Sequence, residues 1–434
     1  LSTSSQIAFQ IDRYFGRQSV IAVADQYKKE QGREEAARDA ARGEVSLTES
    51  SPIVVMVRSI IEQAVRQRAS DIHFEPMRDG IRIRFRIDGN LVEAMSYDMS
   101  IYTAIIARLK IISGMDISEK RKPQDGRTTM DIDHVEYDVR VSSIPTVYGE
   151  KIVMRLTNKE KLTRDKRELG LSDDDMKRFD QMLAHPHGII LVTGPTGSGK
   201  STTLYTALSE LNRETVNIVT VEDPVEANID GVNQIQVNPK ADMTFASALR
   251  SILRQDPDII MIGEIRDPET AEIAVQASIT GHLVASTLHT NSTSASIARL
   301  LNMGIEPYLM ADALVGVVAQ RLVRKLCRCK RGREATAQEK EELGVNQDEV
   351  LTIYEPAGCQ LCSQTGYFGR TAVYEMMPVT PELRWAITKM QPSSKVKEIA
   401  QREGMITLRG SAVRLVREGV TSLEEMKKIA SEED

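Results

Sequence analysis

The first 51 residues show two different patterns of hydrophobic and polar positions. Residues 1–35 place the apolar side chains of Ile7, Ile11 and Phe15 at helical spacing, so we expect a helical module there. Because the chain begins with leucine rather than methionine, we expect this module to be part of a longer N-terminal region. Residues 36–51 are polar and charged with little to bury, which predicts a linker.

The next hundred residues alternate between helical and strand patterns. Residues 53–68 repeat apolar positions at the spacing of an amphipathic helix that starts after a proline. The run from Ile81 to Ile87 then alternates strictly, with isoleucine or phenylalanine on one face and arginine on the other, as in a half-buried strand. Residues 52–158 are therefore predicted to form a small α+β domain.

From residue 185 onward, short apolar runs alternate with helical segments. The runs that we expect to be strands are 189–193, 218–221, 259–262 and 283–288. Buried strands between helices predict a mostly parallel sheet, and so an α/β domain. The expected order after the α+β domain is a charged linker at 159–184, the α/β domain at 185–325, a cysteine-bearing insertion at 326–370 and a helical C-terminal region at 371–434.

Composition narrows the classes of partner. The net charge of −6 offers no general attraction to nucleic acid, and neither a basic tail nor an aromatic-rich strand is evident, so no nucleic-acid partner is expected. No apolar run approaches the roughly 20 residues that span a bilayer, and the start does not resemble a signal peptide. We therefore expect a cytoplasmic protein.

The four cysteines of the chain are Cys327, Cys329, Cys359 and Cys362, and all lie within 36 consecutive positions. In a cytoplasmic protein, paired cysteines favour a metal over disulfides. The second pair has the spacing of a zinc knuckle, whereas the first pair is one residue short. We predict a four-cysteine Zn²⁺ site; the alternatives are free buried thiols or a site with a strained or missing ligand.

The segment from residue 194 to 202 matches the P-loop pattern G-x-x-x-x-G-K-[ST], between an expected strand and an expected helix. Its glycines let backbone N–H groups curl around phosphates, and the helix start adds a favourable field for anions. Lys200 is expected to reach the β- and γ-phosphates, and Ser201 to bind Mg²⁺. The predicted ATP-binding residues are Gly194, Pro195, Thr196, Gly197, Ser198, Gly199, Lys200, Ser201 and Thr202.

The expected strand before Glu264 ends at the sheet edge where open α/β sheets bind ligands. Glu264 is the predicted general base that positions the attacking water. Gly263 stands where an acidic residue usually precedes this glutamate, so we expect Ser201 and waters to hold Mg²⁺, with carboxylates around those waters. The alternative is a surface ion pair between Glu264 and Arg266.

Two further expected strands also end in polar residues at this edge, Glu222 with Asp223 and then His289. Glu222 is a candidate catalytic residue; the alternative is a helix cap or a salt bridge. His289 is expected to sense the γ-phosphate or to orient water; the alternative is a structural polar contact.

Arginines of the α+β domain are candidates to neutralise the transition state, since ring-forming ATPases often use cations from a neighbouring unit. Arg127 and Arg140 both lie near turns or on strands among polar neighbours. The alternative for each is a solvated sheet face.

These motifs together resemble those of the bacterial type II secretion and type IV pilus assembly ATPases. The segments that resemble the Walker A, Asp box, Walker B and His box of that family are, in order, 194–201, 221–226, 254–267 and 280–291. Those that resemble its second N-terminal domain are 68–73, 84–89 and 124–127, and the cysteine pairs resemble its zinc-bearing insertion. The resemblance covers about residues 52–434.

The resemblance implies a RecA-like P-loop domain after a smaller, PAS-like α+β domain. It implies a homo-hexamer, held at the cytoplasmic face of the inner membrane through platform and assembly proteins of a pilus or secretion system. ATP hydrolysis would there drive the polymerisation of pilin or pseudopilin subunits. It also implies that Arg127 and Arg140 approach the γ-phosphate when the two domains close.

Three other functions are weaker fits. A pilus-retraction ATPase is disfavoured by the cysteine-bearing insertion, which such enzymes generally lack. A nucleotide-gated scaffold without turnover would be expected to have lost Lys200 or Glu264, and both are present. A DNA-translocating motor is disfavoured by the acidic balance of the chain.

Overall fold

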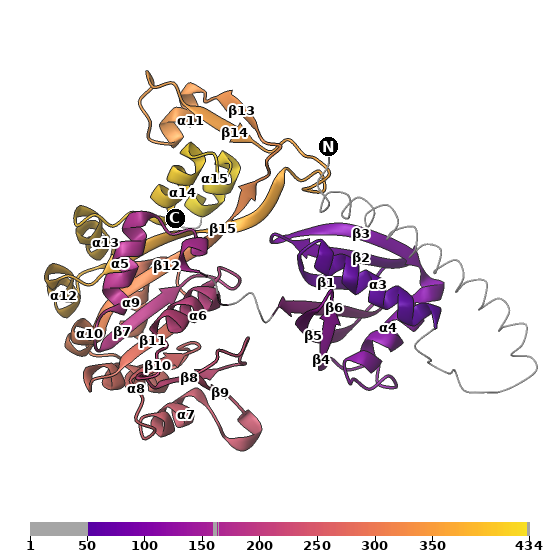
Figure 1. The fold of residues 1–434 in the computed structure, drawn as a ribbon, viewed down its shortest axis with the longest axis horizontal. Coiled ribbons are helices and arrows are strands. Elements are labelled where there is room, and N and C mark those ends of the chain that lie inside the picture. The colour runs from indigo at the N-terminus through magenta and orange to yellow at the C-terminus, as the bar shows by residue number, and fades with distance from the viewer. Residues whose placement is uncertain (1–50, 159–162, 164, 432–434) are drawn as a thin grey trace, which may run out of the picture. The chain divides into compact units, whose positions relative to one another are not determined.

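The computed structural model describes residues 51–158, 163 and 165–431, and the chain divides into two compact units at residue 160 (Figure 1). The predicted helical module at 1–35 and nearly all of the predicted linker at 36–51 lie outside the described residues. Within the described part of the chain, no helix is long and apolar enough to cross a membrane.

The first unit is a six-stranded antiparallel sheet with the strand order β3-β2-β1-β6-β5-β4. Its elements are α3 (Pro52–Arg66), β1 (Ala69–Pro76), β2 (Gly80–Ile87), β3 (Asn90–Asp98), α4 (Met99–Ile112), β4 (Gln124–Ile132), β5 (Val135–Thr146) and β6 (Gly149–Asn158). The expected alternation in β2 is present, since Ile81, Ile83 and Phe85 are buried in one core with residues of α3 and α4. The sheet therefore turns its arginines toward the opposite face.

The second unit is built on a seven-stranded sheet with the order β15-β12-β7-β11-β10-β8-β9. All neighbouring strands run parallel except the pair β12 and β15. Ile189 and Leu191 of β7 pack into one hydrophobic core and Ile190 and Val192 into another, so helices cover both faces. The prediction of a RecA-like, mostly parallel α/β domain is confirmed.

The elements of this unit follow in chain order. They are η3 (Lys166–Leu169), α5 (Asp173–Leu183), β7 (Gly188–Thr193), α6 (Lys200–Leu211), β8 (Ile218–Glu222), β9 (Asn233–Gln236), η4 (Pro239–Ala241), α7 (Phe245–Ile252), β10 (Ile259–Ile262), α8 (Pro268–Ile279), β11 (Leu283–Leu288), α9 (Thr293–Asn302), α10 (Pro307–Ala313), β12 (Leu314–Leu326), β13 (Arg331–Glu334), α11 (Ala337–Glu342), β14 (Thr352–Glu355), β15 (Tyr367–Pro378), α12 (Pro381–Thr388), α13 (Ser393–Arg402), α14 (Leu408–Arg417) and α15 (Leu423–Ser431). The four predicted strands correspond to β7, β8, β10 and β11.

Two long strands that the sequence pattern did not predict, β12 and β15, complete one side of the sheet (Figure 1). The cysteine segment leaves the sheet at the end of β12 and returns at the start of β15. It therefore lies between two strands of the seven-stranded sheet, and the boundary predicted at residue 370 falls within β15. Helices α14 and α15 pack in one core with residues of β12 and β14.

Candidate functional site

The predicted phosphate-binding loop connects the buried strand β7 to helix α6, which begins at Lys200. Gly197 has φ +81° and Gly199 has φ +90°, the left-handed region that glycine adopts without a steric penalty. The loop therefore requires glycine at these two positions. The start of α6 leaves backbone N–H groups without helical partners, which is the feature that binds anions at helix N-termini.

Lys200 holds its ammonium inside the loop, where Nζ donates to the carbonyl oxygens of Gly194 at 2.7 Å and Pro195 at 3.0 Å. Burial lowers the pKa of Lys200 to about 8, although the charges of Glu264 and Glu226 act in the opposite direction. Glu264 is thus close enough to the loop for its charge to act on Lys200. A bound phosphate would supply the negative charge that this buried ammonium favours.

Ser201, the predicted magnesium ligand, donates from Oγ to Oε1 of Glu226 at 3.3 Å. Glu226 closes the segment 221–226 that resembles the Asp box, yet it was not selected as a site residue from the sequence. A hydroxyl beside a carboxylate is the hard oxygen donor set that Mg²⁺ prefers, so the two residues fit this ion. A carboxylate from the loop after β8 therefore lies beside Ser201, although no acidic residue precedes Glu264.

Glu264 follows β10, two strands from β7 in the sheet, with β11 between them. Its side chain is only 12% exposed and lies between Arg266 and His289: Oε1 is 2.5 Å from an Arg266 nitrogen, and Oε2 is 3.3 Å from Nε2 of His289. The ion pair with Arg266 that stood as the alternative is present, but the carboxylate itself is not a surface group. Among the described residues, Oε2 is buried without a hydrogen-bond partner, because the His289 contact does not have hydrogen-bond geometry. One carboxylate oxygen thus has no hydrogen-bond donor among the described residues and is the candidate acceptor for a proton from water.

The loop that contains His289 is hydrogen-bonded to the end of β7, the strand that precedes the phosphate loop. Thr193, the last residue of β7, lies with its hydroxyl 2.6 Å from the Thr290 hydroxyl. The same Thr193 oxygen accepts the backbone N–H of Thr290 at 3.0 Å. The sequence analysis missed this pair, because only the sheet order brings the ends of β7 and β11 together.

Glu222 is buried at the end of β8, and its carboxylate binds three side chains. It accepts from Oγ1 of Thr220 at 2.6 Å, from Nε2 of Gln234 at 3.0 Å and from the hydroxyl of Tyr205. Tyr205 lies on α6, the helix that begins with Lys200. Glu222 therefore connects the helix α6 to the sheet through Tyr205.

Arg127 and Arg140 lie side by side in the first unit, as direct partners in the register of β4 and β5. Both contact the carboxylate of Asp138, through Nε at 2.5 Å for Arg127 and 3.3 Å for Arg140. Asp138 is 1% exposed, whereas the two arginine side chains are 49% and 31% exposed. A buried carboxylate thus holds two guanidinium groups on one face of the sheet, with more positive than negative charge.

The four cysteines form one cluster, and their sulfur atoms all lie within 4.8 Å of one another. The sulfurs of Cys327 and Cys359 are 3.7 Å apart, and those of Cys329 and Cys362 are 3.9 Å apart. Disulfide sulfurs would be about 2.05 Å apart, so the thiols are free. Four thiolates around a tetrahedral ion with metal–sulfur bonds of about 2.3 Å lie about 3.8 Å apart, so this cluster could hold a metal ion. The short Cys-x-Cys spacing does not keep either sulfur of the first pair out of the cluster.

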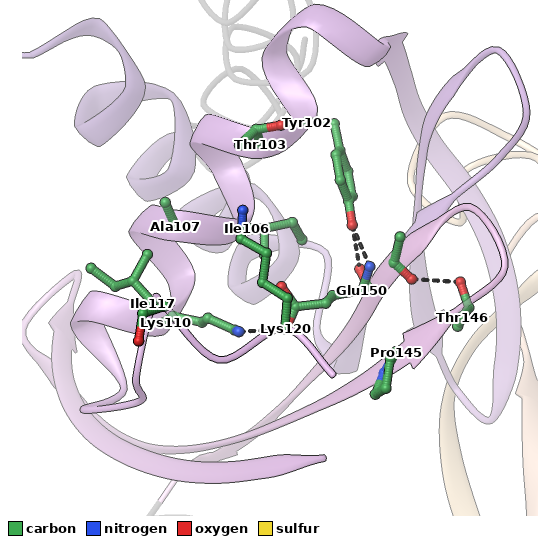
Figure 2. A pocket seen from close by; sticks show the side chains of 12 residues that line it. Tyr102, Thr103, Ile106, Ala107, Lys110, Ile117, Lys120, Pro145, Thr146 and Glu150 are labelled. Atoms are coloured by element: carbon green, nitrogen blue, oxygen red, sulfur yellow. Dashed lines mark hydrogen bonds and ion pairs between the residues drawn. The ribbon is translucent and has the colours of Figure 1, made fainter. Parts of the chain in front are cut away.

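A cavity of about 540 Å³ lies in the first unit, between α4 and the hairpin of β5 and β6 (Figure 2). Figure 2 shows Tyr102 pointing toward Glu150, whose backbone oxygen accepts its hydroxyl at 3.1 Å. Lys110 and Glu150 form an ion pair at its wall and are 1% and 8% exposed. None of the predicted site residues lines this cavity.

Comparison with known proteins places the chain in a family. The family model for "Type II/IV secretion system protein" matches residues 46–428. The putative type II secretion system protein E of Escherichia coli (strain K12) is 46% identical over 383 residues, which cover 88% of this chain and 78% of that protein. The type IV pilus assembly ATPase PilB of Myxococcus xanthus (strain DK1622) is 49% identical over 383 residues, which cover 87% of this chain and 68% of that protein.

Solved structures show the same fold. The crystal structure of the pilus retraction motor PilT with bound ADP matches with a TM-score of 0.58 and 25% identity, and covers 85% of this chain and 95% of that chain. This match agrees with the mostly parallel sheet of the second unit. The chain therefore belongs to the type II/IV secretion system protein family, and it is an ATPase of that family.

Proposed function

We propose that the chain is a homo-hexameric motor at the cytoplasmic face of the inner membrane, where ATP hydrolysis assembles a type IV pilus or a type II secretion pseudopilus. The observation that carries the proposal is a nucleotide site with a free Glu264 oxygen, in a chain 46–49% identical to a type II secretion protein E and to a pilus assembly ATPase. In this proposal the motor reaches the membrane through platform and assembly proteins of the machine.

The phosphate loop, residues 194–202, binds the triphosphate of ATP in this proposal. Lys200 turns from the carbonyl oxygens of the loop toward the β- and γ-phosphates, which offer it full negative charge. Ser201 and Glu226 would hold Mg²⁺ beside the loop. Mg²⁺ would neutralise charge that develops on the phosphate oxygens.

Glu264 is the proposed general base. Arg266 holds one of its oxygens and leaves the other, Oε2, to accept a proton from the attacking water. His289 lies beside Oε2, half exposed, where it can orient the same water or contact the γ-phosphate. Glu222 supports the site by anchoring α6 through Tyr205 rather than by contacting the reacting atoms.

Arg127 and Arg140 are the proposed cations that stabilise the transition state when the two units close. Two observations support this role. Arg127 and Arg140 are direct partners in the register of β4 and β5, and both contact Asp138, which fixes their guanidinium groups while leaving them partly exposed. Rigid strands hold such groups more accurately than loops do, and cations that reach a phosphoryl group in this way act by electrostatic stabilisation.

Zn²⁺ is the ion proposed for the cysteine cluster, because sulfur distances of 3.7–3.9 Å suit a tetrahedral thiolate site. Two backbone N–H groups, from Cys359 and Gly366, donate to the sulfur of Cys362 and would stabilise a thiolate there. The ion would join the end of β12 to the start of β15.

Elemental analysis of the purified full-length chain should give about one zinc per chain, because four thiolates complete the coordination of one ion. Cys362→Ser should lower the zinc content and the thermal stability, whereas Ser363→Ala, at the next residue, should change neither. A zinc-free preparation in which all four thiols react at once with a thiol reagent would contradict the site.

Sequence identity favours pilus assembly over pilus retraction as the function of the motor. The pilus assembly ATPase shares 49% of aligned residues with this chain, whereas the retraction motor PilT shares 25%. Pilus retraction is therefore the second candidate, supported by the shared fold alone.

The test is deletion of the gene in its own bacterium, complemented with the wild-type chain or with Lys200→Ala. Loss of surface pili or of protein secretion, restored by the wild-type chain and not by the variant, is the expected result. Cells with excess pili would instead identify a retraction motor. Unchanged pili together with unchanged secretion would overturn the proposal.

A further inference from the structure

The strand β12 runs beside β7 and continues past its end, to the position where the phosphate loop begins. The register pairs Ala319 of β12 with Thr193, the last residue of β7. Gln320 therefore lies one residue beyond the paired segment, next to the loop. It is 1% exposed, so any polar contact that it makes is shielded from water.

Gln320 uses both ends of its side-chain amide at the loop. Its Nε2 donates to the backbone oxygen of Ser198 at 2.7 Å, and its Oε1 accepts from Oγ1 of Thr203 at 2.9 Å. Ser198 belongs to the loop, and Thr203 lies in the first turn of α6. One buried side chain thus joins the loop to the helix that follows it.

Two glycines of the loop, Gly194 and Gly199, leave room for Gln320. A Cβ added at Gly194 would lie 2.5 Å from the backbone oxygen of Gln320, and a Cβ added at Gly199 would lie 3.1 Å from its Nε2. The P-loop pattern therefore requires glycine at these two positions partly because β12 packs against the loop.

The hydrogen bond to Ser198 also fixes the direction of a phosphate-binding group. The carbonyl of Ser198 and the N–H of Gly199 belong to one planar trans peptide, so they point in opposite directions. Because Gln320 holds the carbonyl toward β12, the N–H of Gly199 points away from β12. Backbone N–H groups of such loops are the donors that surround the phosphates.

We propose that Gln320 is a positioning residue of the nucleotide site, which orients the peptide between Ser198 and Gly199 so that the Gly199 N–H is presented to bound phosphate. Lys200 does not fix this peptide, because its ammonium contacts the carbonyl oxygens of Gly194 and Pro195. Gln320 contacts no reacting group, and it acts through the shape of the loop. ADP and ATP both carry the phosphates that this part of the loop would contact. The affinity for each nucleotide should therefore depend on Gln320.

The test is Gln320→Leu in the full chain, which keeps the bulk and removes both hydrogen bonds. Loss of an oriented donor weakens the ground state and the transition state alike, so the KM for ATP and the Kd for ADP should rise about tenfold while kcat stays within about twofold. Thr203→Val keeps the bond from Gln320 to Ser198, so its effect on the Kd for ADP should be smaller.

Val318→Ala is the matched control, because Val318 is 0% exposed on the same strand but packs in the hydrophobic core. It should lower the melting temperature and leave the Kd for ADP unchanged. If Gln320→Leu lowers the melting temperature and leaves the Kd for ADP at the wild-type value, Gln320 is a core residue and the proposal is wrong. These assays use the isolated ATPase, so their outcome does not depend on which machine the chain powers.

Discussion

Lys200→Ala should raise the Kd for ATP at least about 100-fold. Lys200 is 9% exposed and its ammonium lies inside the loop, so it would meet the phosphates in a site with little water. A charge-assisted hydrogen bond under such conditions contributes more than a neutral one, and its loss leaves phosphate charge without a partner. The measurement is equilibrium binding of a fluorescent ATP analogue to the full chain in the presence of Mg²⁺.

The stability of the same variant separates lost binding from lost folding. Burial lowers the pKa of Lys200 to about 8. Below that pH, the buried positive charge therefore lowers the stability of the folded protein when no nucleotide is bound. Lys200→Ala should therefore melt no lower than the wild-type chain at pH 7. Lys240→Ala removes an exposed lysine of the same unit and should leave the Kd unchanged. Unchanged nucleotide affinity in Lys200→Ala would refute the phosphate loop.

Glu264→Gln should reduce kcat by about 10²- to 10⁴-fold and leave the Kd for ATP within about threefold. Glutamine keeps the size and the oxygen beside Arg266, but it cannot take a proton from water. The carboxylate does not contact the loop directly in the described structure, so its removal should spare binding. Steady-state hydrolysis measured beside equilibrium binding gives both quantities.

Glu269→Gln is the matched control for this experiment. Glu269 lies five residues further along, is 57% exposed and pairs with Arg250 on the surface. Its replacement removes the same charge and should leave kcat unchanged. A kcat within about threefold of wild type in Glu264→Gln would exclude Glu264 as the base.

The central strands of the second unit could be predicted from sequence because they are short, mostly apolar and bounded by helices. β12 could not, because its first half is apolar and its second half, from Arg321 to Leu326, mixes basic and apolar residues. No turn separates it from α10, which ends at Ala313. Its pairing with β7 and β15 joins segments far apart in the chain, and no local pattern carries that information.

The residues of the candidate site also divide into those that the sequence predicts and those that it does not. The loop residues and Glu264 carry motifs, so the sequence pointed to them. Glu226 and Thr290 lie inside the motif segments 221–226 and 280–291, but the sequence does not single them out within those segments. Thr193 and Gln320 lie outside the motifs, and only the sheet order makes them neighbours of the phosphate loop.

The cysteine spacing shows a limit of a different kind. Counting residues between Cys327 and Cys329 suggested a strained corner, because a zinc knuckle normally has two intervening residues. The structure brings both sulfurs into the cluster, since this pair leaves the end of β12 and is not confined to a knuckle turn. The number of residues between two cysteines therefore does not by itself exclude either of them from a metal site when the pair follows the end of a strand.

Single-turnover cleavage of radiolabelled ATP by Glu264→Gln tests the catalytic site most directly. With the chain in excess over ATP, the variant should retain bound ATP uncleaved over a time in which the wild-type chain converts it all to ADP and phosphate. Cleavage of the bound ATP by the variant at the wild-type rate would contradict the assignment of the water-activating group.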